Sequence, residues 1–86
     1  MNNKKIKYPQ YRKYSNGKSF FKIISPTKFE EIQVLGNKAT LHLFEAKILP
    51  DKNYIYDLTF DYENYWVICS EEEYKKTQES TSISLD

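Results

Sequence analysis

The sequence contains few side chains that could carry out acid–base or nucleophilic chemistry. His42 is the only histidine and Cys69 the only cysteine among 86 residues. Both fall inside segments predicted to be strands, whereas catalytic groups are found disproportionately on loops. We therefore interpret Cys69 as a buried structural thiol and His42 as a strand residue beside Glu31. One cysteine and one histidine also cannot supply the four ligands of the usual zinc site.

Acidic and amide side chains occur in two short segments that could bind a hard cation. The first segment holds Asp51, Asn53 and Asp57, and the second holds Asp61 and Glu63. A calcium loop requires a glycine at its turn and a glutamate at its end, and neither stands at the required spacing. The sequence also lacks a glycine-rich phosphate loop and a Gly-x-Ser-x-Gly nucleophile motif. We therefore predict a protein that is not an enzyme and that binds no metal or cofactor.

Basic and aromatic residues alternate near the N-terminus and form a candidate surface for an anionic partner. Rings that stack on bases beside cations that contact phosphates would suit single-stranded nucleic acid. The sequence pI of about 7.8 is well below that of a strongly basic nucleic-acid-binding domain. The alternative, which we favour, is that the rings pack inward while the cations are solvated. The residues of this candidate surface are Lys7, Tyr8, Tyr11, Arg12, Lys13, Lys18 and Lys22.

The formal net charge of +1 is unevenly distributed along the chain. Residues 1–22 carry seven basic side chains and no acidic one, whereas residues 51–86 carry nine acidic and three basic side chains. Such asymmetry can indicate an anionic partner for the basic end. It is equally compatible with attraction between the two ends within the fold.

Length and composition predict one small domain. Residues 1–76 form a single β-rich domain in this interpretation, with residues 1–7 frayed and residues 77–86 a flexible polar tail. No apolar run is long enough to span a membrane, and the N-terminus does not resemble a signal peptide. With a single cysteine, a fold held by disulfides is excluded. We expect a soluble cytoplasmic protein without a membrane partner.

Two segments are predicted to form β-hairpins. In residues 31–48, Gly36 and Asn37 form the turn, and the strand pairs that follow are Leu35–Lys38, Val34–Ala39, Ile32–Leu41 and Glu31–His42. In residues 10–25, Asn16 and Gly17 predict a two-residue type I′ turn.

The other segments are assigned from local patterns. Residues 26–29 are predicted to form one helical turn before a strand that begins near Glu31, although a helix over residues 26–35 is the alternative. Alternating side chains predict a strand over residues 54–60, and residues 65–69 are predicted to form a last strand after a turn at residues 61–64. Ser70 and Glu73 form a capping box, which predicts a short helix starting after Ser70.

These elements predict a mainly β fold. We expect five or six antiparallel strands in meander order, curled into a small, partly open barrel, with a short C-terminal helix. The sequence does not identify a function. The leading interpretation is a small non-enzymatic interaction module that binds a protein partner through a sheet edge or an aromatic patch. The alternative is a nucleic-acid-binding β-domain that uses the basic, tyrosine-rich N-terminal hairpin.

Overall fold

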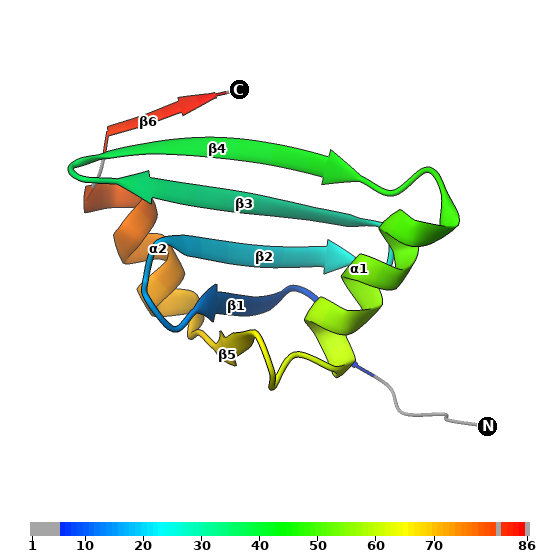
Figure 1. Cartoon of the computed structure of the whole chain (residues 1–86). Coiled ribbons are helices and arrows are strands. Elements are labelled where there is room, and N and C mark those ends of the chain that lie inside the picture. The colour runs from blue at the N-terminus through cyan, green and yellow to red at the C-terminus, as the bar shows by residue number, and fades with distance from the viewer. Residues whose placement is uncertain (1–5, 81, 86) are drawn as a thin grey trace.

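The fold is one six-stranded sheet with a helix on each face (Figure 1). The computed structural model describes residues 6–80 and 82–85. Its elements in chain order are β1 (Gln10–Tyr14), β2 (Ser19–Ser25), β3 (Lys28–Leu35), β4 (Lys38–Glu45), α1 (Leu49–Phe60), β5 (Trp66–Ile68), α2 (Glu71–Ser80) and β6 (Ser82–Leu85).

The sheet is open and its strand order is β5-β1-β2-β3-β4-β6. Strands β1 to β4 form a meander of antiparallel hairpins, and β5 adds to β1 in the antiparallel sense. β6 pairs with β4 in the parallel sense, so β5 and β6 form the two edges. The prediction of a mainly β domain built on an antiparallel meander is confirmed, and its sheet is an open one with two helices.

The β3–β4 hairpin has the register that the sequence predicted. All four predicted pairs occur, from Leu35–Lys38 to Glu31–His42. Gly36 has a φ of 63°, and no residue other than a glycine has a positive φ in the described part of the chain. A positive φ at only the first central residue is the pattern of a type II′ turn.

The β1–β2 hairpin turns at the predicted place but with a different geometry. Gly17 has a φ of 73°, whereas the φ of Asn16 is not positive, so the predicted type I′ turn is wrong. The Gly17 amide donates to the Tyr14 carbonyl over 2.9 Å, and the Asn16 side chain accepts from the Lys18 amide over 2.8 Å. The asparagine therefore stabilises the loop through its side chain rather than through a left-handed backbone.

The segment between β2 and β3 is a tight turn rather than a helix. β3 already begins at Lys28, so the predicted helical turn over residues 26–29 is wrong. The Ser25 hydroxyl accepts from the Thr27 amide over 3.2 Å and thereby closes a turn instead of capping a helix. Phe29 is buried in the sheet next to Phe21, and this packing favours the strand.

Residues 54–60 form most of helix α1, so the predicted strand there is wrong. Pro50 and Asp51 lie in the first turn, where a missing amide and a negative charge are both favourable. The Asp51 carboxylate also accepts from the Ile48 amide over 3.4 Å. Ile55 and Leu58 are buried against the sheet, which stabilises the helix in spite of the alternating sequence.

β5 and α2 follow the prediction for residues 65–76. The Ser70 hydroxyl accepts from the Glu73 amide over 3.0 Å, as expected for an N-cap. α2 runs on through Ser80, and residues 82–85 pair with β4 as β6, in the segment for which the sequence predicted a flexible polar tail.

Two hydrophobic clusters lie on opposite faces of the sheet. Phe20 and Phe21 are neighbours in β2 whose side chains point to opposite faces, because strand side chains alternate. The α2-side cluster contains Tyr11, Phe20, Ile32, Ala39, Cys69 and Tyr74. The α1-side cluster contains Phe21, Ile23, Phe29, Ile55, Leu58 and Trp66. Neither described helix is long and apolar enough to span a membrane.

Candidate functional site

The basic and aromatic residues of β1 point to different faces of the sheet. Because side chains alternate along a strand, Arg12 faces α1, whereas Tyr11 and Lys13 face α2. The candidate surface predicted from the sequence is therefore divided by the sheet.

Arg12 is an internal residue with 3 % of its surface exposed. Its guanidinium donates to the carbonyls of Leu58 (3.1 Å) and Thr59 (2.9 Å) in the last turn of α1, and to the Tyr11 carbonyl (2.8 Å). It also lies 4.1 Å from the centroid of the Tyr62 ring, as in a cation–π contact. Burial lowers the pKa of the Arg12 guanidinium, but arginine remains protonated in proteins. This cation binds the end of a helix and is not available to an external partner.

Tyr11 is buried against α2. Its ring lies 5.3 Å from the ring of Tyr74, with an angle of 49° between the planes. The Tyr74 hydroxyl donates to the Glu30 carboxylate over 2.9 Å. Burial, together with the nearby Glu30, raises the pKa of Tyr74 above its ordinary value. Tyr11 therefore has no exposed ring face on which a base could stack.

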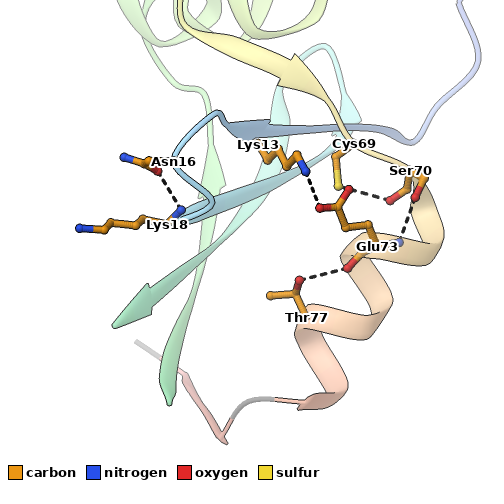
Figure 2. A network of polar contacts seen from close by, with 7 residues as sticks. All are labelled: Lys13, Asn16, Lys18, Cys69, Ser70, Glu73 and Thr77. Carbon is orange, nitrogen blue, oxygen red and sulfur yellow. Dashed lines mark hydrogen bonds and ion pairs between the residues drawn. The ribbon is translucent and has the colours of Figure 1, made fainter. Parts of the chain in front are cut away.

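Lys13 forms an ion pair with Glu73 of α2 (Figure 2). This hydrogen bond raises the pKa of Lys13. Cys69 lies beside the pair, and its thiol donates to the Ser70 carbonyl over 3.3 Å. Burial, followed by the charge of Glu73, raises the pKa of the Cys69 thiol to about 11, which is the reverse of what a nucleophilic cysteine needs. Basic and acidic ends of the chain thus meet at this point, as one of the two interpretations of the charge asymmetry expected.

The remaining members of the predicted surface are separated. Lys7 precedes β1 and Lys18 follows it, so these two exposed cations lie at opposite ends of one strand. Lys22 is half-buried and is paired with Tyr11 in the register, on the α2 face. Tyr8 is half-buried and packs against the α1-side cluster. The structure does not bring the seven residues together on one face.

His42 lies opposite Glu31 in the β3–β4 ladder, as predicted. One of its ring nitrogens, Nε2, is 3.2 Å from the Oε1 atom of Gln33. Within the described ranges, no three His, Cys, Asp or Glu side chains are close enough to hold a metal ion.

The edge of the sheet at β5 carries residues for which the sequence predicts a strand and no further role. Tyr65 and Ile68 are 70 % and 64 % exposed, and Val67 is also exposed. The segment contains no charged residue and no proline, although natural sheets usually protect an edge with such residues. The sequence indicates a strand here through four consecutive β-prone residues, from Tyr65 to Ile68. Only the strand order shows that this strand lies at an edge of the sheet.

At Ile68 of β5, the backbone amide and carbonyl both point away from the sheet. The Cys69 amide donates to the Tyr11 carbonyl over 3.2 Å, which makes this pair a hydrogen-bonded one. Because hydrogen-bonded and non-bonded pairs alternate in an antiparallel ladder, the amide and carbonyl of Ile68 point outward, away from β1. They are available to an additional strand.

The opposite edge is covered by the chain itself. β6 pairs with residues Lys38 to Leu41 of β4. The two edges therefore differ: one is protected by the C-terminal strand, and β5 is not paired on its outer side by any described element.

Comparison of the chain with protein-family models, with curated proteins and with solved structures finds no match.

Proposed function

We propose that the chain is a small non-enzymatic module that binds a protein partner through the edge strand β5. The observation that carries this proposal is the exposed, uncharged and outwardly unpaired segment formed by Tyr65, Val67 and Ile68. An extended segment of a partner can add to such an edge through main-chain hydrogen bonds, with side chains on alternate faces giving specificity.

The contrast between the two edges supports this choice. An unpaired edge favours association with other chains, and natural proteins limit that tendency unless the edge has a use. The β4 edge is shielded by β6, whereas β5 relies only on its shortness. Exposed apolar side chains on both faces of β5 would be buried when a partner strand is added.

The charges around β5 indicate the chemistry of the partner. Glu63 precedes the strand and Glu72 follows it at the start of α2, whereas the neighbouring Glu71 is already paired with Lys75 over 2.9 Å. A partner segment with an apolar centre and basic residues at its ends would match this pattern. The nucleic-acid alternative has less support, because Arg12, Tyr11 and Lys13 already contact other parts of the chain.

Site-specific photocrosslinking tests the proposal in cells that express the protein. A photoreactive phenylalanine analogue replaces Tyr65 in one variant and Leu35 in the other. Leu35 is 74 % exposed and lies at the β3–β4 turn, so it is a matched exposed apolar position. We expect a discrete crosslinked protein from position 65 and none from position 35.

A second substitution tests whether the main chain of β5 is used. Ile68→Pro removes the outward amide without removing a hydrogen bond to β1. It should abolish crosslinking from position 65 while the unfolding midpoint changes little. Equal crosslinking from both positions, or crosslinking that persists in folded Ile68→Pro, would refute binding at this edge.

A further inference from the structure

We propose that a cavity beside α1, separate from the β5 edge, binds a small carboxylate with an apolar tail. The cavity has a volume of about 580 Å³, within the usual range for ligand pockets. It lies between α1, the segment that precedes β1 and the turn between β2 and β3. This inference does not depend on the proposed protein partner.

The walls of the cavity are mainly apolar and aromatic. Tyr56 and Phe60 are one helical turn apart on α1, and their ring centroids are 4.9 Å from each other. Ile6, Tyr8 and Pro26 contribute the other walls. Tyr56 and Phe60 remain partly exposed, so a ligand tail would remove their apolar surface from water.

The polar groups of the lining favour a negatively charged head group. Lys52 is the one charged residue among the described residues that line the cavity, and the Asn53 side chain and Thr27 hydroxyl can also donate hydrogen bonds. The neighbouring Asp51 carboxylate is directed to the amides of Lys47 (3.1 Å) and Ile48 (3.4 Å). An anion at Lys52 would therefore meet donors and a positive charge.

Lys52, Tyr56 and Phe60 follow one another at intervals of four residues on α1. Residues spaced in this way lie in a row on one side of a helix. The row places the cation at one end of the cavity and the aromatic rings along it. A linear molecule with one carboxylate and an alkyl chain fits this arrangement, whereas a compact polar metabolite does not.

Titration of ¹⁵N-labelled protein with sodium decanoate tests the inference. For a molecule with about twelve heavy atoms, typical binding efficiencies correspond to a Kd of about 2 mM or tighter. We expect saturable changes in the amide signals of Thr27, Asn53 and Thr59, with little change in β5. Decylammonium chloride, which shares the tail but carries the opposite charge, should bind several-fold more weakly.

Two variants separate the head group from the tail. Lys52→Gln should weaken decanoate about two- to fivefold, as for the loss of one exposed ion pair, and should not weaken decylammonium. Tyr56→Ala removes part of the aromatic wall from an exposed helical position and should weaken both decanoate and decylammonium by a similar factor. Lys76→Gln on α2 is the control and should bind decanoate like the parent.

The inference is overturned by any of three results. The first is that decanoate binding does not saturate up to about 10 mM, which is well above the expected Kd. The second is that decylammonium binds as tightly as decanoate. The third is that the signal changes are centred on β5 instead of α1. The last result would show that the alkyl chain binds the exposed edge of the sheet.

Discussion

Replacing Arg12 is expected to destabilise the protein strongly, because this buried side chain connects two elements of the fold. Its guanidinium joins β1 to the C-terminal turn of α1 through the carbonyls of Leu58 and Thr59. The last carbonyls of a helix have no partner within the helix, so Arg12 provides donors that α1 cannot supply itself.

The size of the effect follows from these contacts. In Arg12→Met the apolar stem is kept, but the buried carbonyls of Leu58 and Thr59 lose their charged donor, at a cost of about 1–3 kcal/mol each. The Tyr11 carbonyl also loses Arg12 but keeps the Cys69 amide as a donor. Loss of the contact with the Tyr62 ring adds about 0.5–2 kcal/mol. Removal of a buried charge offsets part of this sum. We expect a net loss of about 2–4 kcal/mol, which is a large part of the free energy of unfolding of a domain this size.

Urea denaturation at neutral pH, followed by the fluorescence of Trp66 and by circular dichroism, measures this loss. A change of about 3 kcal/mol would lower the midpoint by about 1–3 M urea for a typical small domain. Arg12→Lys should fall between the parent and Arg12→Met, because an ammonium group cannot reach both carbonyls in the fork geometry of a guanidinium. Lys18→Met, at the exposed β1–β2 turn, is the control.

Two results would refute this reasoning. One is an Arg12→Met midpoint that corresponds to a loss below about 0.5 kcal/mol, the range of ordinary surface substitutions. The other is an equal loss in Arg12→Lys and Arg12→Met, which would show that the positive charge itself contributes nothing.

Four further predictions concern the cap, the turn, the thiol and the basic end. Ser70→Ala should lower the free energy of unfolding by about 1 kcal/mol in urea denaturation, because the Glu73 amide loses its acceptor. Gly17→Val should cost about 1–3 kcal/mol in the same assay, because valine disfavours the φ of 73°. The pKa of the Cys69 thiol is raised from 9.0 to about 11 in the folded protein, so the thiol of the unfolded chain loses its proton at lower pH. The resulting contribution to the free energy of unfolding is fully present below pH 9 and is lost as the pH rises towards 11. Cys69→Ala should abolish this part of the loss of stability at alkaline pH. Single-stranded oligonucleotides should bind negligibly even at low salt, as measured by fluorescence anisotropy.

Each of these predictions has a contradicting outcome. An unchanged midpoint in Ser70→Ala would show that the hydroxyl does not stabilise α2, with Ser15→Ala as the exposed control. A Gly17→Val variant as stable as the parent would show that the turn adopts another backbone. Identical pH profiles for Cys69→Ala and the parent would contradict the raised pKa. Oligonucleotide binding that weakens steeply with salt, with a logarithmic slope of about −2 to −3, would support the nucleic-acid alternative instead.

The β3–β4 hairpin was predictable because turn and pattern agreed. Gly36 fixes the position of the two-residue turn, so Leu35 pairs with Lys38 and each further pair lies one residue farther along both strands. The register could therefore be predicted from the sequence without tertiary information. The same holds for the capped start of α2, where Ser70 supplies its own local signal.

Helix α1 was missed because its apolar residues do not fall on one side. Tyr54 and Phe60 are partly exposed while Ile55 is buried, so alternation in the sequence looked like a strand. Pro50 and Asp51 were the available signal, and both were assigned to a turn. The hydrogen-bond partners of Arg12 could not be predicted from the sequence either, because the two carbonyls belong to a helix and lie 46 and 47 residues away along the chain.

The exposed edge at β5 depends on topology rather than on composition. A run from Tyr65 to Ile68 in the centre of a sheet would be ordinary core. It is exposed here because β5 joins the free side of β1 and no described strand follows it.

The path of the second half of the chain has a consequence for the order of folding. After β4, the chain passes along α1 on one face to β5 at the far edge, then returns along α2 on the other face to β6 beside β4 (Figure 1). The elements α1, β5, α2 and β6 therefore surround a meander that β1 to β4 form from consecutive segments. The meander consists of local pairings, which form quickly, whereas the encircling contacts close long loops. During synthesis the meander emerges first, so the chain can be wound around a sheet that is already formed.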